Sequence, residues 1–175
     1  FLPVEEHIEM LKKVLSWAQT RETKPLDKIR VVLEGTFCEQ PPLEFIEGVE
    51  DVCYIVDDDF ILALRWITGD VPENGDPLYS LAKSYRDLFS YASIQHDGRR
   101  PKYEPFMEKF HNARAQAAIL SPPKFCEPGL DDQVLFSQAL DREGIPYLTM
   151  EFEEKMATFE ELRLQVETFA ESLLF

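Results

Sequence analysis

The sequence predicts an α/β fold, a three-layer sandwich around a parallel sheet of about four strands. Four short runs of apolar, β-branched or small residues stop abruptly at turn-forming or acidic residues, as strands buried on both faces do. Helical segments separate these runs, and strands joined through helices pair in parallel with right-handed crossovers. The expected type is therefore flavodoxin-like or Rossmann-like.

The first predicted element is a helix that ends near Thr20. Its apolar residues recur at i, i+4, i+7, i+11 and i+14, which places them on one stripe: Val4, Ile8, Leu11, Leu15 and Ala18. This stripe needs a partner surface. A polar connector that contains Pro25 then leads to the first strand. Because the chain starts at Phe1 without an initiator Met, we expect a piece of a longer polypeptide.

Strands and helices then alternate to the end of the chain. The strands are expected at residues 29–33, 52–56, 116–120 and 145–150. The helices are expected at residues 41–50, 60–67, 77–89, 103–114, 128–143 and 158–175. Asp76 supplies an N-cap and Pro77 a first-turn proline, while Thr158 and Glu161 form a capping box for the last helix.

Composition argues against several classes of function. Of the 175 residues, 33 are acidic and 18 basic, and the resulting formal net charge of −15 repels phosphate backbones and anionic membrane surfaces. No apolar run approaches the roughly 20 residues that span a bilayer. We therefore expect a soluble, cytoplasmic protein without a nucleic-acid or membrane partner.

The candidate site residues follow the predicted strands. In a parallel sheet, ligands bind outside the carboxyl ends of the strands. Cys38 and Glu39 follow the first strand and Asp57, Asp58 and Asp59 the second. The third strand is followed by Lys124, Phe125, Cys126 and Glu127. The sequence contains no dinucleotide-binding, P-loop, nucleophile-elbow or zinc-protease motif, so catalytic residues stay unassigned.

The three cysteines do not form a disulfide framework, which leaves reduced thiols or metal ligands. Cys126 lies in a proline-bracketed loop before a helix, where the positive end of the helix dipole favours a thiolate. It is either a metal or cluster ligand or a small buried hydrophobe, and Cys38 has the same two interpretations. Cys53 lies inside an apolar strand and is expected to be structural.

The three consecutive aspartates at residues 57–59 also have two interpretations. They are either a cation or phosphoacceptor site or an N-cap with solvated acids in the first turn of the next helix. Receiver domains place the acceptor after the third strand, where this chain has Cys126 and Glu127, so a receiver domain is excluded.

Several segments together resemble one family. They are residues 32–42, 53–60 with Arg65, 76–78, 124–129 and 144–146. In this order and spacing they resemble the 2-hydroxyacyl-CoA dehydratase / benzoyl-CoA reductase family, from about residue 29 to 175. The Cys-Glu-Gln-Pro-Pro segment at Cys38 and the Tyr-Ile-Val-Asp-Asp-Asp segment at Tyr54 are most similar to a benzoyl-CoA reductase subunit.

The resemblance implies an oxygen-sensitive subunit of two similar α/β lobes with a [4Fe–4S] cluster between them. Residues 29–175 would be the C-terminal lobe, and residues 1–28 a leading helix and connector from a missing N-terminal lobe. Cys126, in the Lys-Phe-Cys-Glu-Pro motif, would be a cluster ligand, and Cys38 a weaker candidate. The remaining candidates would line the same cleft: Glu39, Asp57, Asp58, Asp59, Lys124, Phe125 and Glu127.

The implied activity is low-potential electron transfer to an acyl-CoA thioester. A separate ATP-hydrolysing activator would deliver the electrons, a homologous second subunit would complete a heterodimer, and the isolated piece would lack the cluster and be inactive. Ring reduction of an aromatic acyl-CoA or radical dehydration of a 2-hydroxyacyl-CoA would follow.

Two other functions stay open from the residues alone. One is a non-catalytic scaffold lobe in an electron-transfer complex. The other is a CoA- or nucleotide-binding module, for which a basic patch at Arg99, Arg100 and Lys102 could meet an anionic ligand, although such a patch is also typical of a solvated loop.

Overall fold

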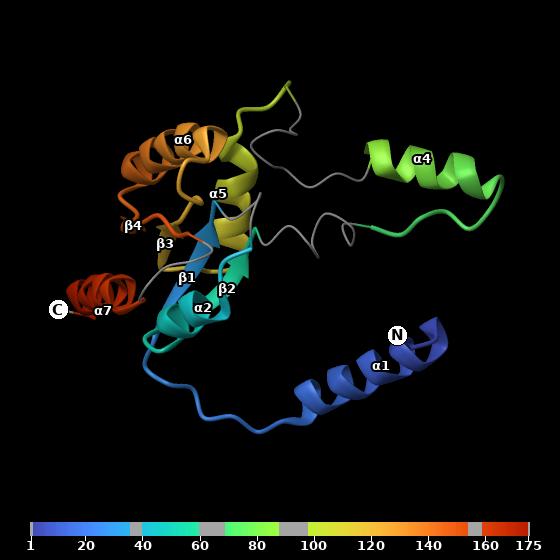
Figure 1. Ribbon diagram of the computed structural model, residues 1–175, viewed down its shortest axis with the longest axis horizontal. Coiled ribbons are helices and arrows are strands. Elements are labelled where there is room, and N and C mark those ends of the chain that lie inside the picture. The colour runs from blue at the N-terminus through green and yellow to red at the C-terminus, as the bar shows by residue number, and fades with distance from the viewer. Residues whose placement is uncertain (1, 36–39, 60–68, 88–97, 154–158, 175) are drawn as a thin grey trace.

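Four parallel strands form the sheet, in the order β2-β1-β3-β4, in a computed structural model of the chain (Figure 1). The structure describes residues 2–35, 40–59, 69–87, 98–153 and 159–174. The strands are β1 (Ile29–Glu34), β2 (Cys53–Asp58), β3 (Ala117–Leu120) and β4 (Tyr147–Thr149). The predicted α/β class and four-stranded parallel sheet are confirmed.

Helices cover both faces of this sheet. The described helices are α1 (Val4–Thr20), α2 (Leu43–Glu50), α4 (Pro77–Asp87), α5 (Tyr103–Asn112), α6 (Glu127–Glu143) and α7 (Glu160–Leu174). The helices α2 and α7 pack on one face, and α5 and α6 on the other (Figure 1). The result is the three-layer arrangement that the sequence predicts.

Each face of the sheet has its own apolar core. Val31 and Leu33 of β1 face α2 and α7, whereas Val32 faces the aromatic side chains of α5 and α6. Phe106 of α5 and Phe136 of α6 stack there with ring centroids 4.8 Å apart. Because successive residues of a strand point to opposite faces, a strand covered on both sides reads as a continuous apolar run.

The second strand is longer than its apolar run. It continues through Asp57 and Asp58, whose backbones lie opposite Val32 and Leu33, after a register shift that skips Val56. The sequence predicted that Asp57 and Asp58 follow the strand. In the structure they belong to it. The predicted helix at 60–67, the end of the helix at 77–89 and the capping Thr158 lie outside the described residues.

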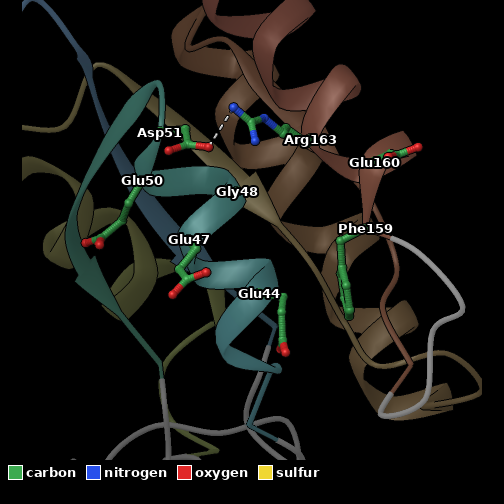
Figure 2. Close-up of a pocket in the computed structure, with 8 residues that line it drawn as sticks. All are labelled: Glu44, Glu47, Gly48, Glu50, Asp51, Phe159, Glu160 and Arg163. Carbon is green, nitrogen blue, oxygen red and sulfur yellow. Dashed lines mark ion pairs between the residues drawn. The ribbon is translucent and has the colours of Figure 1, made fainter.

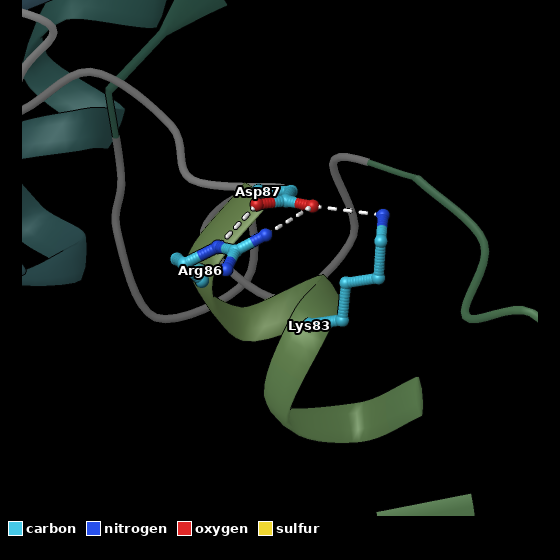
Figure 3. Close-up of polar contacts among 3 residues, drawn as sticks. All are labelled: Lys83, Arg86 and Asp87. Atoms are coloured by element: carbon cyan, nitrogen blue, oxygen red, sulfur yellow. Dashed lines mark hydrogen bonds and ion pairs between the residues drawn. The ribbon is translucent and has the colours of Figure 1, made fainter. Parts of the chain in front are cut away.

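The helices α1 and α4 lie apart from the sheet (Figure 1). No residue of α1 is buried. The predicted N-cap of α4 is confirmed, because the carboxylate of Asp76 accepts a 2.9 Å hydrogen bond from the Tyr79 N–H. At the other end of α4, Lys83 and Arg86 converge on Asp87 (Figure 3), and their hydrogen bonds, led by that of Arg86, lower the pKa of Asp87 to about 2.

Among the described helices, none combines the length and the apolar character that crossing a membrane requires.

Candidate functional site at the carboxyl edge of the sheet

The carboxyl ends of the strands are joined by backbone hydrogen bonds. The Ser121 N–H donates to the Glu34 carbonyl at 2.7 Å, and the Asp59 N–H donates to the Leu33 carbonyl at 3.2 Å. The Met150 N–H reaches the Leu120 carbonyl at 3.0 Å. The segments that follow the four strands therefore start from one rigid edge, as the sequence predicts for this fold.

Gly35 allows the first and third strands to approach at this edge. Its φ of +108° lies in a region that residues with a side chain rarely adopt, and a Cβ there would lie 2.9 Å from the Pro122 nitrogen. The Gly35 N–H donates a 2.8 Å hydrogen bond to the carboxylate of Asp59. A glycine is thus required where the chain leaves β1.

A buried charge cluster, which we define as Glu34, Asp59 and Lys109, adjoins this turn. Glu34, the last residue of β1, is only 1% exposed. Lys109 of α5 donates to Glu34 Oε2 at 2.5 Å and to the Asp58 carbonyl at 3.2 Å. Within the described structure, Glu34 Oε1 has no hydrogen-bond partner. The Lys109 ammonium group therefore pairs with one buried carboxylate, that of Glu34, while the nearby charge of Asp59 acts on both groups.

Burial raises the pKa of Glu34 to about 8. Lys109 opposes this shift, while the negative charges of Asp59 and Asp57 add to it. A carboxyl group in such a place takes up a proton rather than remain as an uncompensated buried charge. Burial thus favours the neutral form of the Glu34 carboxyl, whereas the ion pair with Lys109 favours its ionised form.

Cys126 lies just before a helix, as the sequence predicts, and forms the N-cap of α6. Its N–H donates to the Pro123 carbonyl at 3.0 Å, and its carbonyl accepts from the Leu130 N–H at 2.9 Å. The side chain is partly exposed, in contrast to Cys53, which is buried in β2. Cys126 therefore lies at the N-terminal end of a 17-residue helix, where the helix dipole is positive.

The predicted neighbours of Cys126 form an exposed loop. Phe125 is 81% exposed and has a φ of +65°, which is unusual for a bulky residue. Lys124 forms a 2.6 Å ion pair with Glu153, and its ammonium lies 5.5 Å from the centre of the Phe125 ring. Glu127 is exposed in the first turn of α6. Lys124, Phe125 and Glu127 thus lie at the surface, next to Cys126 in the sequence.

Two of the three aspartates at residues 57–59 accept hydrogen bonds from backbone N–H groups. Asp59 accepts from Gly35, and Asp57 Oδ1 accepts a 2.8 Å hydrogen bond from the Asp58 N–H. Across the described ranges, no group of three or more His, Cys, Asp or Glu side chains could hold a metal ion. The described residues can therefore offer a cluster one thiolate, from Cys126, and not a complete set of ligands. Cys38 and Glu39 lie outside the described residues.

The basic patch at residues 99–102 is partly neutralised by acidic partners. Arg100 pairs with Glu104 at 3.2 Å and with Glu108 at 2.7 Å. Lys102 forms a 2.9 Å ion pair with Asp132, which is buried in α6. A CoA- or nucleotide-binding module would need these cations for its ligand, so the geometry does not favour that function.

A groove of about 540 Å³ lies between α2 and α7 (Figure 2). It is lined by Glu44, Glu47, Gly48, Glu50, Asp51, Phe159, Glu160 and Arg163. Arg163 pairs with Asp51 at 2.9 Å and with Glu167 at 3.0 Å. The carboxylates that line the groove are exposed, and no thiol lines it. The groove is therefore an acidic surface feature and not a cluster site.

Sequence reasoning missed Glu34 and Lys109. A signal for Glu34 exists, because it directly follows an apolar strand core. Lys109 lies between Phe106 and Phe110 at helical spacing, on the side of α5 that faces the sheet. Neither observation shows that the two side chains meet, since they are 75 residues apart in the sequence.

Comparison of the sequence with known proteins identifies its family. Residues 1–173 match the 2-hydroxyglutaryl-CoA dehydratase, D-component (HGD-D) family. The chain belongs to this family. The resemblance inferred from the sequence motifs is confirmed, and the match extends further toward the N-terminus than those motifs did, because it includes α1.

Three curated relatives of this HGD-D family chain are subunits of acyl-CoA enzymes. It is 34% identical over 174 residues to a benzoyl-CoA reductase subunit of Thauera aromatica. It is 26% identical to the beta subunit of the lactoyl-CoA dehydratase of Anaerotignum propionicum and 24% identical to the (R)-phenyllactyl-CoA dehydratase beta subunit of Clostridium sporogenes. Each match covers 98–99% of this chain but only 45–46% of the relative. The chain thus spans about half the length of these relatives.

Proposed function

We propose that this chain is the C-terminal lobe of an iron–sulfur subunit of an ATP-dependent benzoyl-CoA reductase. The 34% identity to the benzoyl-CoA reductase subunit of Thauera aromatica, over 98% of the chain, is the observation that carries this proposal. The position of Cys126, partly exposed at a helix N-terminus on the carboxyl edge, supports it. The enzyme would be a cytoplasmic oxidoreductase that acts on an aromatic acyl-CoA thioester in anaerobic aromatic degradation.

The cofactor of this proposal is a [4Fe–4S] cluster, which supplies low-potential single electrons when bound. Cys126 would hold one iron of it. Because the described residues provide one thiolate, further ligands would come from Cys38 or from outside this chain, and the isolated chain is expected to be inactive. ATP would be used on a separate activator, and a homologous subunit would complete the heterodimer.

The chain's own residues would prepare the edge for this chemistry. The Lys124–Glu153 ion pair and the hydrogen bonds of Cys126 fix the loop from which the thiol projects. Gly35 and Asp59 fix the adjacent turn.

A second candidate is a subunit of a 2-hydroxyacyl-CoA dehydratase, because two of the three relatives carry that activity in their names. A non-catalytic scaffold lobe is a third candidate, in which Cys126 would have no ligand role. The fold is the same in all three cases, and fold does not decide between reactions.

Activity assays separate these candidates. The complete subunit, with its partner subunit and activator, is incubated with ATP and reductant in the absence of oxygen, with either benzoyl-CoA or a 2-hydroxyacyl-CoA. Loss of the aromatic absorption of benzoyl-CoA would support the reductase. Conversion of only the 2-hydroxyacyl-CoA to an enoyl-CoA would assign the dehydratase, and turnover of neither would leave the scaffold.

A further inference from the structure

The helix α1 has an apolar face that nothing in the described structure covers. Val4, Ile8, Leu11 and Leu15 lie on one stripe and are between 44% and 68% exposed. None of the 17 residues of α1 is buried. Isolated helices of this length are marginal in water, and helices in proteins gain most of their stability from packing such a face. The helix therefore requires a partner.

A second exposed apolar face lies on α4. Leu78, Leu81 and Tyr85 follow one another at i, i+3 and i+7, and all three are more than half exposed. In Figure 1, α1 and α4 both extend to the side of the sheet away from α7. One large partner on that side could cover both helices, whereas a short peptide could not.

The comparisons indicate what this partner is. The family match begins at residue 1, so α1 belongs to what the family shares and is not an extension peculiar to this chain. The three relatives are each about twice as long as this chain. More than half of each relative thus has no counterpart here, and this half is large enough to cover the exposed faces.

We propose that the apolar stripe of α1 docks onto the half of the family subunit that this chain lacks. On this account α1 packs as part of that other half, and the connector at residues 21–28 joins the two bodies. The apolar face of α4 contacts the same half. This inference rests on the proposal that the chain is one lobe of a longer subunit, but not on the cluster or on the reaction.

Hydrogen exchange measured by mass spectrometry tests this docking. The isolated chain is compared with a chimera in which it replaces the matched region of the Thauera aromatica subunit. In the isolated chain the amides of residues 4–20 should exchange fast at all protein concentrations. In the chimera they should exchange at least tenfold more slowly, while peptides from β1 and β3 exchange equally in both proteins.

Paired serine variants make the test specific. Leu11→Ser with Leu15→Ser should abolish the protection of α1 in the chimera. The control, Glu6→Ser with Lys13→Ser, makes two changes on the opposite side of the same helix and should retain it. If the control removes the protection and the stripe variant does not, the proposed docking face is wrong.

Two other results would overturn the proposal. Equally fast exchange of α1 in the isolated chain and in the chimera would show that the other half does not cover it. Protection in the isolated chain that increases with concentration would assign the stripe to a second copy. If the chimera fails to fold, the same measurement on the native Thauera subunit decides, because the segment aligned with residues 4–20 must be protected there. Loss of iron or activity would contradict the proposed function but not this docking.

Discussion

Replacing Glu34 by glutamine should make the chain more stable at alkaline pH and change its stability little at acid pH. The carboxyl of Glu34 has its pKa raised from 4.5 to about 8, chiefly by burial. Below pH 4.5 the folded and unfolded states both hold the proton, so this group costs nothing. As the pH rises from 4.5 to 8, the unfolded chain releases the proton while the folded chain keeps it, and the wild type loses stability relative to the variant.

The size of this effect follows from the two pKa values. Each pKa unit corresponds to 1.36 kcal/mol, so the full cost above pH 8 is about 5 kcal/mol. Between pH 5 and pH 8.5 the stability difference between Glu34→Gln and the wild type should change by about 4 kcal/mol in favour of the variant. With a urea m-value of about 2 kcal/mol/M, this moves the difference in urea midpoint by about 2 M.

Urea unfolding of both proteins, followed by circular dichroism at several pH values from 5 to 8.5, measures this change. Glu47→Gln, on the exposed side of α2, is the matched control, and its urea midpoint should equal that of the wild type at every pH. A difference in midpoint between Glu34→Gln and the wild type that does not vary with pH would show that Glu34 is ionised in the folded chain and would refute the reasoning.

Three further predictions concern stability and can be checked by the same urea measurement. Lys109→Met removes the only cation of the buried charge cluster and should destabilise the chain by about 1.4 kcal/mol more at pH 9 than at pH 6, because at pH 9 Glu34 must then be kept protonated one unit above its pKa of about 8; equal losses at both pH values would contradict this. Gly35→Ala should cost about 2–4 kcal/mol, because its Cβ would meet the Pro122 backbone, whereas Gly75→Ala, with the same sign of φ and open space around it, should cost about 1 kcal/mol. Phe106→Ala should cost about 3–5 kcal/mol, because Phe106 is fully buried in the core. Phe125→Gly should cost nothing or stabilise slightly, because the Phe125 side chain is exposed and glycine adopts a backbone φ of +65° without strain.

The strands were predictable because helices cover both faces of the sheet. For that reason β3 reads as a continuous apolar run and β1 as an apolar run interrupted by Arg30, and their positions agree with the structure to within one residue. The end of β2 was not predictable. Aspartates disfavour strands and read as a turn, but here the backbones of Asp57 and Asp58 pair with β1 and outweigh that preference.

The candidate site was predictable only where it is local in the sequence. The prolines around Cys126 and the helix that follows predict its place in a loop just before that helix, and the structure places it at the N-cap. The pairing of Glu34 with Lys109 joins residues 75 apart, and the helical spacing of Lys109 with Phe106 and Phe110 does not identify its partner. Contacts of this kind depend on how the layers stack, which no local pattern contains.

The iron content of the complete subunit tests the central claim most directly. The subunit is reconstituted with iron and sulfide in the absence of oxygen, as wild type, as Cys126→Ser and as Cys53→Ala, the last being a control at the buried thiol of β2. We predict that Cys126→Ser loses iron and the visible absorption of the cluster, while folded Cys53→Ala retains both. Unchanged iron and absorption in Cys126→Ser would contradict the assignment of Cys126 as a cluster ligand.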